Sequence, residues 1–169
     1  MFLHFDRGRH LARQYDCYVV KSIGDSFMVA FRTSTDAVLF ATDFSIGTGV
    51  EYISIRAGIN SGQVQIREND IYGLNVNFTS RIQHVIDHVG IFMSNSVYID
   101  YVKAFGEDTP GVRFIKREVD LKSFGPQSLW EIRTREWVKA VGEQNRARKV
   151  ILSELSKEAL VGIPKLRNS

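Results

Sequence analysis

Short β-rich runs alternate with helical runs along this chain of 169 residues, and that alternation limits the folds open to it. A helical run from Leu3 to Tyr15 comes first. Two β-rich runs follow, Cys17 to Ser22 and Phe27 to Phe31, separated by Gly24-Asp25, a pair typical of a tight hairpin turn. The chain is therefore predicted to begin with a helix and a hairpin that presents a carboxylate at its tip.

The middle and the end of the chain continue this pattern. Ser34 or Thr35 can cap a helix to about Phe44, and Gly47 and Gly49 end it. The other predicted elements are a half-covered strand from Ile53 to Ile59, a short strand from Val64 to Arg67, an amphipathic helix with the apolar stripe Phe78, Ile82, Val85, Ile86 and Val89, a buried strand from Gly90, a helix to about Phe105, and two late strands, Val112 to Leu121 and Ser128 to Arg133.

Interleaved strands and helices with two hairpins predict an α/β sandwich with a mixed sheet and helices on one face. The length suits one domain, residues 1–133, followed by a basic helical extension, residues 134–169. That extension has eight Lys or Arg against four Glu, so it accounts for the net charge of +3. The domain itself is then close to neutral, and no nucleic-acid-binding face is expected on it.

The sequence also limits the compartment. No apolar run is long enough to span a membrane, and no leader with a charged, then apolar, then small-residue pattern is visible. The single cysteine, Cys17, cannot form an internal disulfide. We therefore expect a cytoplasmic domain.

Four polar motifs stand out from this pattern by their spacing. Lys21 stands four residues before Asp25. Asp70 stands seven residues before Asn77, and Arg81 follows that asparagine by four. The four motifs are KSIGDSFMVAF from Lys21, RAGINSG from Arg56, DIYG from Asp70 and NFTSR from Asn77.

With these motifs, the chain from about Leu11 to Arg133 resembles the class III nucleotide cyclases. The resemblance implies the ferredoxin-like βαββαβ fold of that family. It further implies an enzyme that converts ATP to 3′,5′-cyclic AMP and pyrophosphate in signal transduction. Cyclase domains of this kind are usually driven by regulatory domains, which would lie outside this chain.

The resemblance assigns the catalytic pair to Asn77 and Arg81. An asparagine amide both donates and accepts hydrogen bonds, which suits the orientation of a ribose. A guanidinium stays charged and bridges phosphate oxygens in a planar fork, which suits the neutralisation of a triphosphate in the transition state.

Lys21 and Asp70 match the substrate-binding pair that reads the purine in adenylate-specific members. A lysine donates to the N1 acceptor of adenine, and a carboxylate accepts from the 6-amino group. Guanine presents a donor and a carbonyl at these places, so both contacts would be mismatched. The resemblance therefore implies ATP rather than GTP.

Asp25 matches one of two aspartates with which the family holds a pair of Mg²⁺ or Mn²⁺ ions. The first strand of the family, with the other aspartate, would lie upstream of Met1. Asp6 does not replace that aspartate, because it lies 19 residues before Asp25 in a helical context. The chain is thus either an N-terminally truncated domain or a disabled relative, and we expect it to make little or no cyclic AMP alone.

In this family the site is shared by two chains of a head-to-tail dimer. If this holds here, Lys21, Asp25 and Asp70 act opposite Asn77 and Arg81 of the second copy, and the homodimer has two sites. The alternative function, from another class, is a catalytically impaired cyclase-homology module that dimerises or binds a nucleotide.

Overall fold

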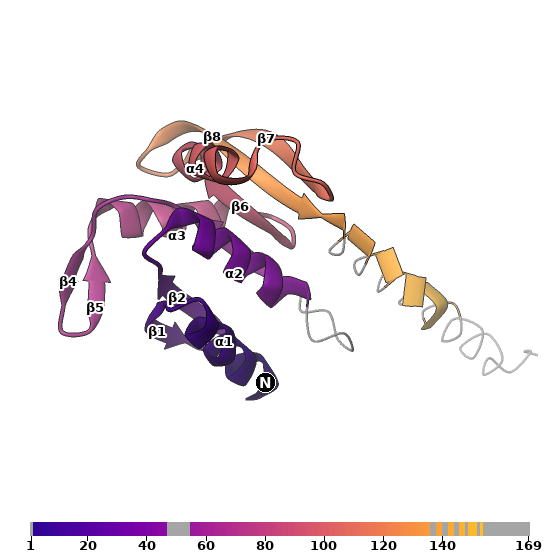
Figure 1. The fold of residues 1–169 in the computed structure, drawn as a ribbon, viewed down its shortest axis with the longest axis horizontal. Helices are drawn as coiled ribbons and strands as arrows, with labels where there is room; N and C mark the ends of the chain where they lie inside the picture. The colour runs from indigo at the N-terminus through magenta and orange to yellow at the C-terminus, as the bar shows by residue number, and fades with distance from the viewer. Residues whose placement is uncertain are drawn as a thin grey trace, which may run out of the picture.

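The computed structural model describes residues 2–46 and 55–135, together with residues 138–139, 142–143, 146–147, 149–151 and 153. Figure 1 shows the order of the elements along the chain. They are α1 (Phe2–Gln14), β1 (Tyr18–Ile23), β2 (Ser26–Ala30), α2 (Ser34–Ile46), β3 (Arg56–Ile59), β4 (Gln65–Arg67), β5 (Asp70–Tyr72), α3 (Leu74–Val85), β6 (Gly90–Ser94), α4 (Asn95–Phe105), β7 (Val112–Leu121) and β8 (Gly125–Thr134).

Most of the predicted elements are confirmed, with shifts of a few residues at their ends. β8 begins at Gly125, three residues before the predicted Ser128. The amphipathic helix ends at Val85, so Val89 lies outside it. The predicted helix end at Gly47 and Gly49 lies outside the described residues.

Two local signals shape the first half of the chain. β1 and β2 pair in antiparallel fashion with Ile23 opposite Ser26, and Gly24 takes a φ of 60° in the turn between them. A left-handed φ costs glycine little, which explains its place in a tight turn. The cap of α2 is Thr33 rather than Ser34 or Thr35, because the Thr33 hydroxyl accepts a hydrogen bond from the Asp36 amide at 3.2 Å.

The central sheet has four strands in the order β3-β6-β8-β7. β3 and β6 are parallel, whereas β6 with β8 and β7 with β8 are antiparallel. The predicted mixed α/β fold is therefore confirmed. Two further pairs, β1 with β2 and β4 with β5, form separate two-stranded sheets.

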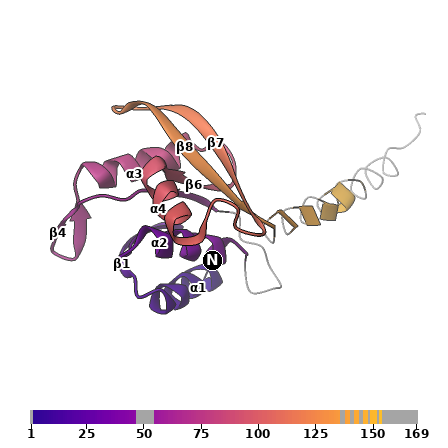
Figure 2. The ribbon, with the colours of Figure 1, turned by 45° about the horizontal axis from the view of Figure 1, so that its top comes forward.

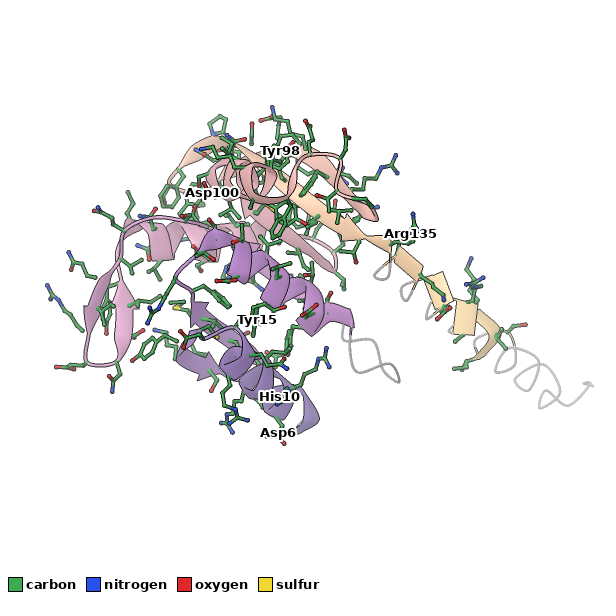
Figure 3. The ribbon with its side chains drawn as sticks, viewed as in Figure 1. Asp6, His10, Tyr15, Tyr98, Asp100 and Arg135 are labelled. Atoms are coloured by element: carbon green, nitrogen blue, oxygen red, sulfur yellow. The ribbon has the colours of Figure 1, made fainter. Side chains whose placement is uncertain are left out.

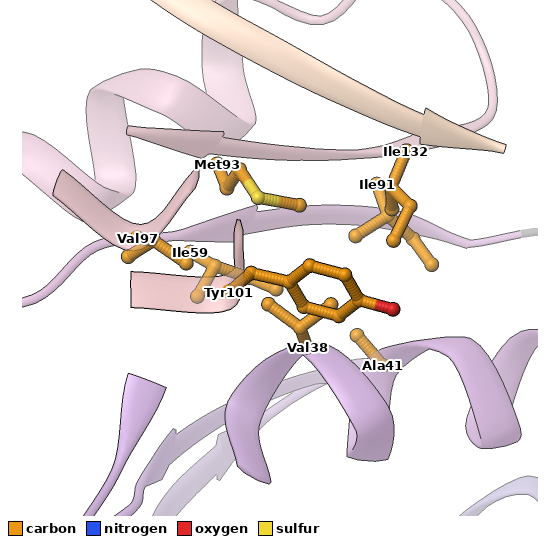
Figure 4. Close-up of a cluster of buried hydrophobic side chains, with 8 residues drawn as sticks. All are labelled: Val38, Ala41, Ile59, Ile91, Met93, Val97, Tyr101 and Ile132. Atoms are coloured by element: carbon orange, nitrogen blue, oxygen red, sulfur yellow. The ribbon is translucent and has the colours of Figure 1, made fainter. Parts of the chain in front are cut away.

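The expectation that the helices lie on one face of the sheet is wrong in one respect. α2 and α4 cover one face, where Val38 and Tyr101 pack on Met93 (Figure 4). α3 covers the other face, where its Ile82 packs on Phe92. Because Phe92 and Met93 are neighbours in one strand, their side chains point to opposite faces. The sheet therefore has a core on each side.

A third apolar cluster joins α1 and the first hairpin to α2. Leu11 and Ala12 of α1 pack with Phe40 and Phe44 of α2, and Phe27 of β2 packs against them. Figures 1 and 2 show α2 between α1 and the four-stranded sheet. α2 is thus the element that connects the small hairpin sheet to the central one.

The two remaining features lie at the margins of the fold. The β4–β5 hairpin projects from the body (Figure 1), and its Ile66 is 70% exposed. Beyond β8, the described residues from Arg135 onward are helical. In the part of the chain that the structure describes, no helix has both the length and the apolarity of a membrane span.

Candidate active site

Lys21 lies on β1, where the register with β2 shifts between Val19 and Lys21. Irregularities of this kind re-aim the side chains of a strand. The Lys21 ammonium donates a hydrogen bond to Asp70 Oδ2 at 2.8 Å, and its side chain is 37% exposed. The structure therefore brings together the two residues expected to read the purine.

Asp70 is held by the turn before it. Glu68 and Asn69 have φ values of 49° and 63°, so β4 and β5 are joined by a two-residue turn in the left-handed region. Asp70 Oδ1 also accepts a hydrogen bond from the Ile71 amide at 2.8 Å. The hydrogen bond from Lys21, followed by that from the Ile71 amide, lowers the pKa of Asp70, so the carboxylate is ionised at neutral pH.

Asp25 lies at the tip of the β1–β2 hairpin and is exposed. Ser26 Oγ lies 3.5 Å from its Oδ1, and the carboxylate is otherwise open to solvent. Among the described residues, no three His, Cys, Asp or Glu side chains gather into a possible metal site. Asp25 is a suitable ligand for Mg²⁺ or Mn²⁺, but the residues present do not fit a complete two-ion site.

Asp6 was not expected to replace the missing aspartate. It lies on α1, and its side chain is exposed. Figure 3 shows Asp6 and His10 on the side of α1 that faces away from the rest of the molecule, whereas Tyr15 points toward α2.

Asn77 and Arg81 lie one turn apart on α3. Two side chains anchor this helix to the core. Ile82 is fully buried, and Phe78 packs edge-on against Phe124 at a centroid distance of 4.9 Å. Asn77 is exposed and Arg81 half-buried. The amide and the guanidinium are therefore presented on a face of α3 that the core does not use.

Gly58 determines how closely α3 approaches β3. A Cβ at this position would lie 2.8 Å from the Gln83 amide nitrogen and 2.9 Å from the Thr79 carbonyl oxygen. These are backbone atoms of α3, which cannot move without the helix. The glycine of the RAGINSG motif thus sets the position of the helix that holds Asn77 and Arg81.

Asp25 lines a groove to which Asn77 and Arg81 do not contribute within the described part of the chain. The groove has a volume of about 1150 Å³, and the residues that α3 contributes to it include Thr79, Ser80 and Gln83. A single chain therefore brings Lys21 and Asp70 into contact, whereas Asn77 and Arg81 do not line the groove that Asp25 lines.

Sequence reasoning missed a buried charge next to this helix. Glu131 of β8 is fully buried, on the sheet face that α3 covers. Its carboxylate accepts hydrogen bonds from Arg133 Nε at 2.8 Å and Arg117 Nη2 at 3.0 Å. Burial raises the pKa of Glu131, but the two guanidiniums outweigh it, and the pKa lies below its ordinary value. The sequence pattern that could have revealed it is the alternation along β8, in which Glu131 occupies a position whose side chain points toward the core.

The loop between β3 and β4 is tied to the start of α3 by a second set of contacts that the sequence did not reveal. Asn75 Nδ2 donates to the Gln63 carbonyl at 2.9 Å, and Asn60 Nδ2 donates to Asn75 Oδ1 at 3.3 Å. Asn60 belongs to the RAGINSG motif, so its side-chain amide was the one feature of the sequence that could have pointed to these contacts. These contacts position the first turn of α3.

Two histidines near α3 do not form a site. His84 Nδ1 lies 2.6 Å from the Ser80 carbonyl oxygen, one turn earlier on the helix. His88 lies beyond the end of α3, with Nδ1 2.5 Å from Asp87 Oδ1 and Nε2 3.7 Å from Glu131 Oε1. Both rings are therefore engaged in local contacts within the described residues.

Comparisons with known proteins agree with this geometry. Residues 1–123 match the family described as the adenylate and guanylate cyclase catalytic domain. A putative adenylate cyclase of Rhizobium meliloti (strain 1021) is 25% identical over 125 residues, which cover 64% of this chain and 21% of that protein. An uncharacterized protein of Mycobacterium tuberculosis (strain ATCC 25618 / H37Rv) is 37% identical over 60 residues, or 36% of this chain and 21% of that protein.

The chain thus spans about a fifth of the length of the curated relatives that it matches. Among solved structures, an adenylate cyclase of Trypanosoma brucei in its monomeric state superposes with a TM-score of 0.65 at 20% identity, over 77% of each chain. The guanylyl cyclase Cya2 superposes with a TM-score of 0.58 at 19% identity, over 76% of each chain. These similarities extend to proteins named for either nucleotide.

Proposed function

Since this chain belongs to the adenylate and guanylate cyclase catalytic domain family, we propose that it converts ATP to 3′,5′-cyclic AMP and pyrophosphate. The single observation that supports adenine over guanine is the ion pair between Lys21 and Asp70, with 2.8 Å between ammonium nitrogen and carboxylate oxygen. It fixes a donor and an acceptor side by side, in the arrangement that N1 and the 6-amino group of adenine require. A guanine would meet a donor with a donor and an acceptor with an acceptor.

The chemistry of the proposed reaction assigns a role to each side chain on α3. The ribose 3′-hydroxyl attacks the α-phosphorus, and pyrophosphate leaves. Asn77 orients the ribose through its amide, and Arg81 neutralises charge on the phosphate oxygens as the new bond forms. A guanidinium suits this role because it presents several donors in a planar fork that matches phosphate oxygens.

The family generally uses divalent metal ions, and we propose Asp25 as one ligand for Mg²⁺ or Mn²⁺. Such ions stabilise negative charge on the attacking and leaving oxygens. The exposed position of Asp25 at the hairpin tip supports this role, because its carboxylate is free to bind. A complete two-ion site would need further ligands from outside the described residues.

We further propose that the active form is a homodimer in which the two halves of the site come from different copies. The groove that Asp25 lines supports this arrangement, because neither Asn77 nor Arg81 of the same chain contributes to it. A two-fold pair would bring the hairpin of one copy to α3 of the other, twice. Regulatory domains outside this chain would then act by changing how the copies meet.

A second candidate function is a cyclase-homology module that binds a nucleotide or dimerises without catalysis. The observation that favours it is that, among the described residues, no three His, Cys, Asp or Glu side chains gather where they could hold a metal ion. The two candidates share the fold and the purine-binding pair. They differ in whether product forms.

The experiment that tests the proposed function measures cyclic AMP and cyclic GMP from ATP and GTP in the presence of Mn²⁺. We expect at most a low rate of cyclic AMP formation from this chain alone, and we expect Asp25→Ala and Arg81→Ala to abolish whatever product the native chain makes. Arg113→Ala, which removes an exposed arginine on β7, is the matched control and should retain the native rate. If the chain binds ATP but Asp25→Ala does not change the amount of product, the result would favour the non-catalytic module instead.

A further inference from the structure

A row of arginines crosses one face of the central sheet. The register pairs Arg56 of β3 with Gly90 of β6, and Arg113 of β7 with Arg133 of β8. The antiparallel register of β6 with β8, continued by one residue, places Gly90 beside Arg133. The arginine row therefore reads Arg56, Gly90, Arg133 and Arg113 across the four strands.

The arginine row lies on the α3 side of the sheet, where that helix stops. Two residues along, β6 and β8 carry Phe92 and Glu131 on the face that α3 covers, so the alternation of a strand puts the row on the same face. Arg56 Nη1 donates to the Ile86 carbonyl at 3.3 Å, just beyond the end of α3. Arg56 and Arg113 are both exposed, so the row is accessible to a ligand.

The positive charge of the row is only partly balanced. Glu131 is shared by Arg117 and Arg133, with N to O distances of 3.0 and 2.8 Å. Within the part of the chain that the structure describes, no carboxylate forms an ion pair with Arg56 or Arg113. The row thus concentrates cations on a domain that is otherwise close to neutral.

Asp87 does not remove this surplus. Its exposed carboxylate contacts His88 Nδ1 at 2.5 Å, and Nε2 of the same ring lies 3.7 Å from Glu131 Oε1. With Asp87 counted beside Glu131, two carboxylates stand against four arginines. A surplus of two positive charges remains.

The arrangement of two of the arginines favours a doubly charged anion. Arg113 and Arg133 are directly opposite each other on neighbouring strands, and like charges at such positions destabilise a sheet. A phosphate monoester carries close to two negative charges at neutral pH, so one group can neutralise both arginines. Its oxygens also match the planar fork of a guanidinium. A carboxylate would supply one charge only.

Arg56 provides a second cationic centre. It lies two strands away from Arg133, a separation of about 10 Å between the strands. Gly90, between the two arginines, has no side chain to separate them. A ligand that satisfies the whole row therefore carries two anionic groups, one for each centre.

We propose that the arginine row binds a small molecule with two phosphate groups, one held by Arg113 and Arg133 and the other by Arg56. A nucleic acid is a poorer ligand, because Phe92, the aromatic residue beside the row, is buried and offers no surface for base stacking. The proposal goes beyond nucleotide cyclisation and does not rest on it, since binding is measured without nucleotide.

The test is a titration of the unaltered chain with hexane-1,6-diol bisphosphate in the absence of divalent metal ions. The NMR signals of the arginine side-chain Nε–Hε groups report each site separately. Those of Arg56, Arg113 and Arg133 should shift with one saturable curve, whereas that of Arg67, exposed on β4, should not shift. Hexyl phosphate, the matched ligand with one phosphate, should bind about tenfold more weakly.

Three outcomes of the titration would overturn the proposal. Equal affinity for the bisphosphate and for hexyl phosphate would show that the row holds a single group. Equal affinity for octanedioate, which carries two carboxylates, would show no preference for phosphate. No binding, or shifts that include Arg67 to the same extent, would show no site at the row.

Three variants locate the ligand. Arg113→Ala, on the edge strand β7, should weaken binding of the bisphosphate about tenfold, and Arg67→Ala is the matched control that should bind as the native chain does. Arg81→Ala should also leave binding unchanged. Loss of binding in Arg81→Ala, with folding confirmed by circular dichroism, would place the ligand at the candidate active site and contradict the proposal. If Arg113→Ala does not fold, the comparison of the ligands decides alone.

Discussion

The Lys21 ammonium of β1 lies 2.8 Å from Asp70 Oδ2 of β5, although the two residues are 49 positions apart in the sequence. This ion pair joins the β1–β2 hairpin, with Asp25 at its tip, to the projecting β4–β5 hairpin. It positions a cationic donor beside an anionic acceptor on one surface. The purine specificity that we propose depends on this one contact.

The ion pair predicts a pKa that can be measured. Asp70 should titrate below its ordinary pKa of 3.8, because Lys21 favours the charged form. A lowered pKa means that the contact stabilises the folded chain above about pH 4 and that this contribution is lost as the pH falls through the lowered value. Lys21→Met should raise the pKa of Asp70 toward 3.8, as measured by NMR titration of the carboxyl carbon. Lys103→Met, on exposed α4 surface, should leave it unchanged, and equal effects of the two variants would contradict the pairing.

Mixing two inactive variants tests whether the site is shared. Asp25→Ala and Arg81→Ala should each be inactive alone, since each removes one half of both sites. In a random mixture half of the dimers contain one chain of each kind, and each mixed dimer has one intact site, so about a quarter of the native activity should return. The measurement is cyclic AMP formation by chains extended upstream to include the first strand expected for the family, with dimers verified by sedimentation. Mixed dimers without recovered activity would rule out the shared site.

Gly58 predicts a link between packing and activity. Gly58→Ala would drive a methyl group into the backbone of α3, so the helix must shift together with Asn77 and Arg81. We expect the free energy of unfolding to fall by about 2 kcal/mol and turnover to fall with it. Gly142→Ala is the control, because a Cβ there meets no atom within 4 Å. Native stability in Gly58→Ala, measured by urea denaturation, would show that α3 is free to move away from β3.

Glu131 predicts a cost in stability that is independent of the nucleotide. Glu131→Ala leaves two guanidiniums without their shared carboxylate. We expect a loss of about 2 kcal/mol, less than the roughly 3–5 kcal/mol typical of a fully buried pair, because both arginines are partly exposed. Glu118→Gln, at an exposed ion pair with Lys116, should change the free energy of unfolding by less than about 0.5 kcal/mol. Similar losses in the two variants would mean that burial of Glu131 is unimportant.

The sequence predicted well wherever a local signal decides the structure. The glycine turn at Gly24-Asp25 produces the first hairpin, and the apolar run from Gly90 becomes the fully buried strand β6. The stripe on α3 was only partly correct, since Ile82 and Ile86 are buried whereas Val85 is 36% exposed. Periodicity finds a helix more reliably than it finds the residues that face the core.

The rest depends on contacts between distant segments, which periodicity does not encode. The close packing of α3 on β3 depends on Gly58, whose missing side chain leaves room for the backbone of the helix. The burial of Glu131 follows from two arginines that reach it across the sheet and along its own strand. For the candidate site, the spacing of the motifs indicated the residues, but only the fold shows that Lys21 contacts Asp70 and that Asp25 lines a groove to which Asn77 and Arg81 do not contribute.

The most direct test of the central claim is the equilibrium binding of ATP and of GTP, measured by calorimetry on the native chain and on the double variant Lys21→Glu with Asp70→Cys. The native chain should bind ATP about tenfold or more tightly than GTP, because guanine mismatches both contacts. The double variant should lose or reverse this preference. Equal affinities for ATP and GTP in the native chain would contradict the assignment of Lys21 and Asp70 as the purine-reading pair.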